Sequence, residues 1–215
     1  SGGLVGSEMC IRDSLNPEAD FPLAIKSGGN KLIWDMRYPG YKEFEGMVFY
    51  SSPNKGPKAI PGEYLISLNY NGEVIEQSLK IEKDPRLENT DKDYRDQFDF
   101  LINVRDQVTR ANSAIIKIRE VQKDLNYLKQ KSGLTEEINN LINQFENKLS
   151  TIENNIHMTK NQSRQDPLNY GIRINNRIAF LLADSQRGDY PPTNQAKAFF
   201  KQITAELDRE MEALE

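Results

Sequence analysis

The stretch YLISLNYNGEVIEQSLKIEKDPR, residues 64–86, decides how this chain folds. Apolar and polar residues alternate from 64 to 70 and again from 74 to 81, which is typical of strands with one buried face. Asn71-Gly72 lies between these runs and favours a tight hairpin, because both turn residues need positive φ. The strand pattern ends at Lys83-Asp84-Pro85-Arg86, and helical patterns follow.

Upstream of the hairpin, shorter apolar runs at residues 21–26, 31–36 and 47–50 are separated by Gly, Pro and Ser. These runs predict three more strands. About five strands in residues 15–88 favour an Ig-like or fibronectin-like β-sandwich, although such folds usually have about seven. We therefore expect an all-β unit that lacks its N-terminal strands and carries an open sheet edge.

The rest of the chain predicts an all-α unit, an antiparallel up-and-down four-helix bundle at residues 89–215. Apolar residues fall at alternating three- and four-residue steps from 101 to 125, with Ile115 in the middle, which is the spacing of a heptad seam. Ser132-Gly133 is a helix stop. Two helices on either side of it form a long helical hairpin at residues 91–157.

Threonines mark the helix starts. Thr90 with Asp93 three residues later resembles a capping box, and acidic residues follow Thr135. A third helix is expected at about residues 170–186, and Thr193 caps the last one.

Composition excludes several classes of function. The chain has 28 Lys and Arg against 32 Asp and Glu, so its net charge of −4 disfavours a nucleic-acid partner. No apolar run approaches the roughly 20 residues of a transmembrane segment. One cysteine and one histidine offer no disulfide and no metal-ligand spacing, so we predict no metal site and no cofactor.

Three aromatic residues, Trp34, Tyr38 and Tyr41, are the candidates for a ligand surface. They could form a platform that stacks on sugars, or Trp34 could lie in the sandwich core with the tyrosines covering its end. We prefer the core interpretation, because sandwiches commonly hold one large buried aromatic. Asp35 and Arg37 should face outward and pair across a strand. Catalysis would need a second carboxylate across a cleft, so we predict no catalytic residue.

Three further features are weighed for a structural or a functional role. His157 ends the second helix, where a cation would interact favourably with the helix dipole. Arg187-Gly188-Asp189 is an integrin-type tripeptide, but a match of this length arises by chance. The mixed polar and apolar run at residues 169–177 could line a ligand pocket; we prefer a buried polar network that fixes helix packing.

The first residues carry a pattern that predicts a foreign origin, with an ordinary flexible leader as the alternative. The run VGSEMCIRDS, residues 5–14, resembles translated sequencing-adapter read-through. We expect residues 1–14 to be a non-native, disordered leader and exclude them from the fold. Cys10 would then not belong to the protein.

Four motifs together carry a family resemblance: WDMRYPG at residues 34–40, GP and PGEY between 56 and 64, PLNYGIR at 167–173 and GDYPPT at 188–193. In this order they resemble the C-terminal region of large secreted bacterial proteins with sortilin-type or Asp-box (BNR) repeat β-propellers, commonly labelled glycosyl hydrolases. The resemblance implies an extracellular, periplasmic or cell-envelope location and an upstream β-propeller of the same parent chain as partner. Any hydrolytic site would lie in that propeller, since no Ser-x-Asp-x-Gly-x-x-Trp box occurs here.

These observations favour a non-catalytic C-terminal accessory or scaffold module of a larger secreted protein. One alternative is a part of a glycoside hydrolase, with Trp34, Tyr38 or Asp35 completing the cleft of the propeller. Another is a coiled-coil protein-interaction module that forms a homo-oligomer through residues 91–157.

Overall fold

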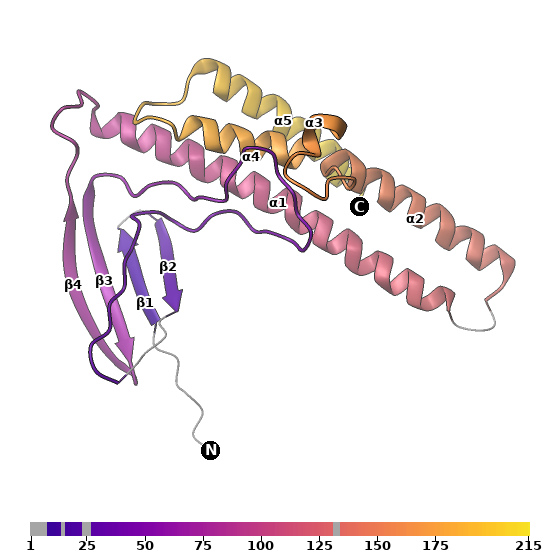
Figure 1. The fold of residues 1–215 in the computed structure, drawn as a ribbon, viewed down its shortest axis with the longest axis horizontal. Coiled ribbons are helices and arrows are strands. Elements are labelled where there is room, and N and C mark those ends of the chain that lie inside the picture. The colour runs from indigo at the N-terminus through magenta and orange to yellow at the C-terminus, as the bar shows by residue number, and fades with distance from the viewer. Residues whose placement is uncertain (1–7, 14–15, 23–26, 131–133) are drawn as a thin grey trace.

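The protein combines an antiparallel sheet with a bundle of helices built on one long helix (Figure 1). The computed structural model describes residues 8–13, 16–22, 27–130 and 134–215. The sheet lies at one end of the long helix, and a helical hairpin projects at the other end (Figure 1). Mixed β and α content, with the β part first, is therefore confirmed.

Four antiparallel strands form the sheet in the order β2-β1-β3-β4. Their bounds are Glu8–Asp13 (β1), Asn16–Pro22 (β2), Gly62–Tyr70 (β3) and Glu73–Ile81 (β4). The expected hairpin is confirmed, since β3 and β4 pair from Gly62 opposite Ile81 to Tyr70 opposite Glu73. Asn71 and Gly72 make its turn with φ of 51° and 87°, the positive values that this short connection requires.

The described residues form a single sheet, so the second sheet of the expected sandwich is not observed. The strands expected at residues 31–36 and 47–50 are wrong, because both stretches lie outside any strand. Of the strand expected at 21–26, residues 21 and 22 belong to β2, and 23–26 lie outside the described part. Met47 and Phe49 instead pack against the helical core, where no strand offers a backbone ladder.

Part of the expected disordered leader is a strand. Residues 8–13 form β1, which pairs with β3 from Glu8 opposite Asn69 to Asp13 opposite Tyr64. An extended segment satisfies the backbone groups along the edge of β3, whatever the origin of its sequence. Residues 1–7 and 14 lie outside the described residues.

The helices begin close to where the sequence predicts. Their bounds are Asp91–Lys129 (α1), Glu136–Ile156 (α2), Pro167–Tyr170 (α3), Ile174–Ser185 (α4) and Asn194–Glu212 (α5). Thr90 and Asp93 form a full capping box. The side chains of Thr135 and Thr193 also accept hydrogen bonds from the first turn of their helices. The caps predicted at Thr90 and Thr193 are confirmed, and Thr135, expected to open the second helix, caps it as well.

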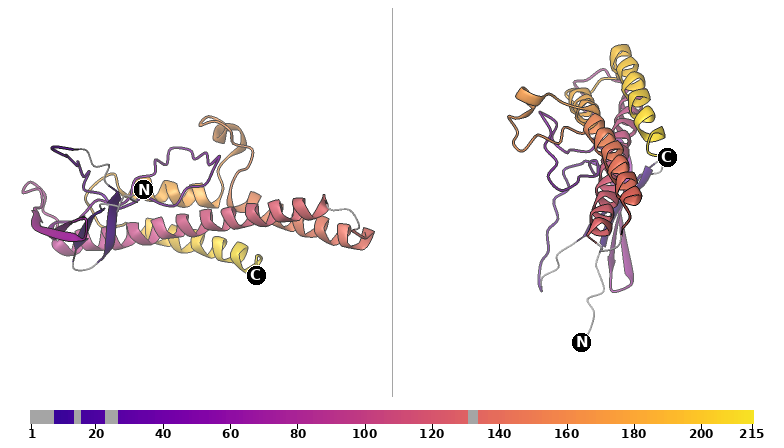
Figure 2. Two further views of the ribbon diagram at one scale, coloured as in Figure 1. Left: turned by 90° about the horizontal axis from the view of Figure 1, so that it is seen from below. Right: turned by 90° about the vertical axis from the view of Figure 1, so that its right-hand side faces the viewer.

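The helices form a bundle in which α2 and α4 follow one another along α1 (Figure 1). Arg119 and Glu153 join α1 to α2, and Gln97 of α1 donates to the Ser185 carbonyl at the end of α4. The last helix, α5, packs beside the half of α1 that α4 covers (Figure 2). The distal end of the α1–α2 hairpin extends past α4 and α5 (Figure 2).

One hydrophobic core runs along α1 and includes residues from outside the helices. The expected seam is confirmed, and its middle residue Ile115 is 0% exposed. Residues 37–57, here called the strap, form a loop that lies across α1 and α4 (Figure 1). Tyr41 of the strap belongs to the helical core, and Phe44, Met47 and Phe49 pack against it. The strap thus shares its core with the helices.

We predict that Ile115→Ala lowers the free energy of unfolding by about 2–5 kcal/mol, because it leaves a cavity in the centre of the seam. Leu168→Ala, at an exposed position, serves as control and should cost less than about 0.5 kcal/mol. Urea unfolding followed by circular dichroism measures both. Equal, small losses for the two variants would show that the α1 seam is not the core.

Candidate functional site

The strap holds three of the residues that the sequence singled out, Arg37, Tyr38 and Tyr41, and a closed loop fixes its shape. Asn54 accepts a hydrogen bond from the Tyr41 backbone N–H and donates to the Tyr41 carbonyl, both at 2.9 Å. The chain returns so closely that a Cβ on Gly56 would lie 1.9 Å from the Tyr38 carbonyl oxygen. Gly56 of the GP motif is therefore needed for backbone approach.

Tyr38 and Tyr41 are both buried, but they pack against the helices and do not cover the end of a sandwich. The Tyr38 ring meets Phe98 of α1 edge-on, with 4.9 Å between ring centroids. The Tyr41 hydroxyl donates to the Ser52 carbonyl at 2.8 Å. Burial, with a smaller contribution from Glu43, raises the pKa of Tyr41, so its phenol stays protonated as a donor. Neither ring is available for stacking on a sugar.

Trp34 is half-buried beside the sheet, where its ring lies 6.0 Å from that of Tyr64. Its Nε1 donates to the Arg37 carbonyl at 3.0 Å. This hydrogen bond closes a turn in which Met36 has a φ of 57°. The indole thus packs on β3 and stabilises the start of the strap.

Asp35 and Arg37 do not pair across a strand, so that expectation is wrong. Asp35 Oδ1 accepts from the Arg37 backbone N–H at 3.0 Å, because the turn at Met36 brings them together. The guanidinium of Arg37 instead donates to the Gly56 carbonyl and to Gln186 Oε1, each at 2.7 Å. Arg37 therefore ties the strap to the residue that follows α4.

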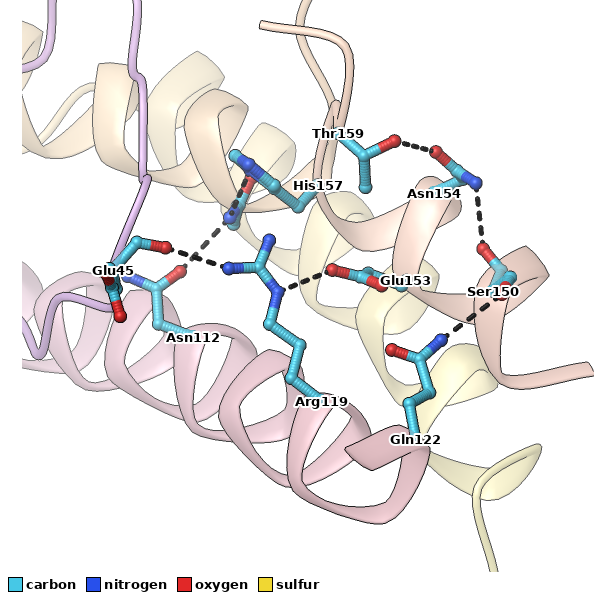
Figure 3. Close-up of polar contacts among 10 residues, drawn as sticks. Glu45, Asn112, Arg119, Gln122, Ser150, Glu153, Asn154, His157 and Thr159 are labelled. Carbon is cyan, nitrogen blue, oxygen red and sulfur yellow. Dashed lines mark hydrogen bonds and ion pairs between the residues drawn. The ribbon is translucent and has the colours of Figure 1, made fainter. Parts of the chain in front are cut away.

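A chain of buried polar side chains links the strap to three helices (Figure 3). Asn175 Nδ2 lies 3.3 Å from His157 Nδ1 and donates to Asn112 Oδ1 at 3.1 Å. Asn112 Nδ2 in turn donates to the Lys42 carbonyl of the strap at 2.7 Å. His157 is 2% exposed, and its ring meets Phe44 edge-on at 4.9 Å.

His157 is neutral at pH 7, which corrects the expectation of a cation at the helix end. Burial, with a smaller contribution from the nearby Arg119, lowers its pKa to about 4, and the contact with Asn175 opposes part of this shift. The aromatic residues of the strap cover the ring and remove it from solvent, which the sequence spacing could not reveal. The described residues contain no cluster of acidic, cysteine or histidine side chains that could hold a metal ion.

The preferred interpretation of residues 169–177 as a buried polar network is confirmed at Asn175 and Asn176. The side-chain amide of Asn176 accepts from the Tyr50 backbone N–H at 2.8 Å and donates to the Tyr50 carbonyl at 3.1 Å. Its Nδ2 also contacts Ser52 Oγ at 3.1 Å. Asn176 thereby gives the strap the pair of backbone hydrogen bonds that a strand partner would supply.

An ion pair with additional contacts anchors the middle of the strap (Figure 3). Arg119 of α1 donates to Glu153 of α2 and to the Glu45 carbonyl of the strap, both at 2.8 Å. Its guanidinium also lies 4.8 Å from the centre of the Phe44 ring. One side chain thus holds α1, α2 and the strap together.

A cavity of about 390 Å³ lies where the sheet meets the bundle. Asp35 and Arg37 line it, together with Lys58, Asp84 and Asp189. Asp84 bonds to Arg86, which lowers the pKa of that carboxyl, and Lys58 lies 3.5 Å from Asp189. Glu82 also lines the cavity and pairs with Lys80 at 3.2 Å. Each of these four carboxylates interacts with a neighbouring side chain or backbone N–H, so the described lining shows no free pair suited to acid–base catalysis.

The Arg187-Gly188-Asp189 tripeptide is part of the same junction. Gln97 of α1 donates to the Gly188 carbonyl at 2.6 Å, and Asn89 donates to the Asp189 carbonyl. Arg187 pairs with Asp184 at 3.2 Å. The tripeptide therefore serves to dock the α4–α5 loop on the start of α1.

Comparison with models of known protein families, with curated proteins and with solved structures finds no match for this chain. Within the described part of the chain, no helix has the length and apolar character needed to cross a membrane.

Sequence reasoning missed Asn112 and Asn54, although both are central to how the strap is held. Asn112 interrupts the apolar run of α1, and a polar residue beside a heptad seam is a weak signal of a buried network. Asn54 carried no such signal, because asparagine is common in loops.

We predict that His157 makes stability depend on pH. Its folded pKa of about 4 lies below the ordinary 6.5, so the unfolded chain binds a proton first as pH falls. Stability should be complete above about pH 7 and fall by about 2 kcal/mol between pH 7 and pH 5. Urea unfolding over this range tests the prediction. His157→Gln cannot titrate and should flatten the profile; an unchanged slope in that variant would contradict it.

We also predict that Asn176→Asp destabilises the fold by at least about 2 kcal/mol. The carboxyl group lacks the amide N–H groups that donate to Tyr50 and Ser52, so buried acceptors lose their partner. Asn169→Asp makes the same chemical change at an exposed position and should stay within about 0.5 kcal/mol. Thermal unfolding at pH 7 compares the two variants; similar midpoints would show that the amide does not hold the strap.

Proposed function

We propose that this chain is a non-catalytic C-terminal accessory module of a larger secreted protein, positioned after a β-propeller. The observation that carries the proposal is the internal use of its conspicuous side chains. Tyr38, Tyr41, Arg37 and His157 all bond or pack within the fold. Side chains that are engaged in this way support a scaffold better than a substrate site.

The strap suits such a module because it couples the sheet to the helices. Its start is held by Trp34 on the sheet side, and its middle is held by Asn176 and Arg119 on the helix side. A helix of 39 residues is about 58 Å long, so α1 can act as a rigid spacer. The sheet would face the upstream propeller, and the helices would extend away from it.

Secretion and the propeller partner rest on the resemblance of the four motifs. Two of these motifs have a structural reason in this fold. Gly56 allows the backbone of the strap to close, and residues 188–193 dock on α1 through Gln97. These two motifs therefore have a structural role in holding the strap, α1 and the end of α4 together.

A second candidate is a contribution to the cleft of a glycoside hydrolase. It is favoured by one observation, that Asp35 and Arg37 line the cavity at the junction. Asp35 is exposed, so it could approach a substrate held by an adjoining domain. An acid of this kind would act together with a second carboxylate from that domain.

An experiment on the full-length parent protein separates the two functions. It requires that the part of the gene upstream of residue 15 is first recovered. We expect Asp35→Asn to leave kcat/KM on glycosides within about twofold of the parent, because a scaffold residue does not touch the reacting atoms. We expect removal of residues 27–215 to lower the melting temperature of the propeller. A loss of about a hundredfold or more in kcat/KM for Asp35→Asn, with an unchanged melting temperature, would overturn the scaffold proposal in favour of the cleft.

A further inference from the structure

The distal end of the α1–α2 hairpin exposes large apolar side chains. Leu128, Ile138, Leu141 and Phe145 are 41%, 43%, 59% and 44% exposed. This end projects beyond α4 and α5, which cover the rest of α1 (Figure 2). Apolar side chains grouped at the end of a projecting hairpin are typical of an interaction surface.

Four exposed residues of α2 form one stripe along this surface. Glu137, Leu141, Phe145 and Lys148 are spaced by four, four and three residues, so they lie on one side of the helix. An acid stands at one end of the stripe, a base at the other, and two apolar residues lie between. Neither charged residue forms an ion pair with another described residue.

The charge order makes this stripe complementary to itself in the antiparallel direction. When two copies of α2 lie antiparallel and centred near residue 143, Leu141 of each meets Phe145 of the other. The same register places Glu137 of each copy opposite Lys148 of the other. A parallel alignment would place like charges together, which is unfavourable.

We propose that the hairpin-tip stripe, residues 137, 141, 145 and 148, is the interface of a two-fold symmetric homodimer. Its occupant is the stripe of a second copy of this chain, because the contact is self-complementary in charge and in apolar character. A shallow hollow lined by Glu137, Asn140, Leu141 and Gln144 lies beside the stripe. In this register the hollow lies opposite the Phe145 side chain of the second copy.

The size of the stripe predicts a weak dimer. One helical face of this length buries less than the roughly 1,200 Å² of a stable complex, so association should be reversible and depend on concentration. We expect a monomer at about 1 µM and a growing dimer fraction between about 10 µM and 1 mM. The inference does not depend on the accessory role, which concerns the sheet end and the parent protein.

Sedimentation velocity of the full 215-residue chain tests the proposal, with reducing agent present so that Cys10 cannot cross-link copies. Leu141→Glu should abolish the dimer up to about 1 mM, because it places an acid against the ring of Phe145. Leu168→Glu makes the same change at an exposed position on α3 and should leave association unchanged. Circular dichroism confirms that both variants keep their helices.

Charge exchange tests the antiparallel register. Glu137→Lys or Lys148→Glu alone creates two like-charge pairs and should weaken the dimer about fivefold or more at low salt. The double exchange restores opposite charges and should return the dissociation constant to within about twofold of the parent. Glu212→Lys makes the same charge change at an exposed position on α5, away from the hairpin tip, and should have no effect on association.

Three outcomes overturn the proposal. One is a monomer at every concentration up to about 1 mM. Another is a dimer that Leu141→Glu leaves intact, which would place association on the open edge of β4 or elsewhere. The third is a failure of the double exchange to restore affinity, since that result would exclude pairing of Glu137 with Lys148 across a two-fold axis.

Discussion

The fold depends on hydrogen bonds between side-chain amides and the backbone of the strap. The strap crosses an apolar helical surface where no strand can pair with it, and buried backbone N–H and C=O groups require partners. Asn176 supplies both partners to Tyr50, Asn112 satisfies the Lys42 carbonyl, and Asn54 joins both backbone groups of Tyr41. With these groups paired, Tyr41, Phe44 and Phe49 can bury their rings against the helices. Because a buried polar group without a partner costs about 1–3 kcal/mol, the aromatic contacts and the amide contacts stabilise the strap only together.

The same network accounts for the state of His157. Its neutral ring fits between the strap and the helices because burial beneath Phe44 disfavours the charged form. Arg119 lies nearby and forms an ion pair with Glu153, so its charge is already balanced by a carboxylate. A charged imidazole would add a second cation in a poorly solvated place. The arrangement therefore uses the histidine as a packed ring and hydrogen-bonding group, which agrees with an architectural role for the whole site.

Local signals in the sequence predicted the helices and the hairpin, while the strap required tertiary information. Thr90, Thr135 and Thr193 mark helix starts through contacts within one turn, and Asn71-Gly72 defines its turn through the conformation of two residues. Residues 47–50 carry the composition of a short strand, but their partners are the helical core and Asn176, which is 126 residues from Tyr50. The apolar composition of the segment predicts that side chains are buried; it does not predict whether a strand or a helix surface buries them. Buried Asn112 was missed for the same reason, since its role appears only when the strap lies beside it.

The apolar spacing of α2 shows that sequence periodicity does not determine which apolar residues are buried. The apolar residues of α2 keep their spacing from Ile138 to Ile156, yet Ile156 is fully buried while Ile138 and Leu141 are 43% and 59% exposed. The difference arises from the lengths of the helices. In the described structure α5 has 19 residues and α4 has 12, so they cover only part of the 39-residue α1 and end before the tip of the hairpin. The apolar residues are thus buried within one copy at the C-terminal end of α2, whereas several of them are exposed at its N-terminal end. A scaffold that was stabilised only by its own core would gain nothing from apolar residues beyond the reach of α4 and α5, so their presence favours a contact outside the single chain.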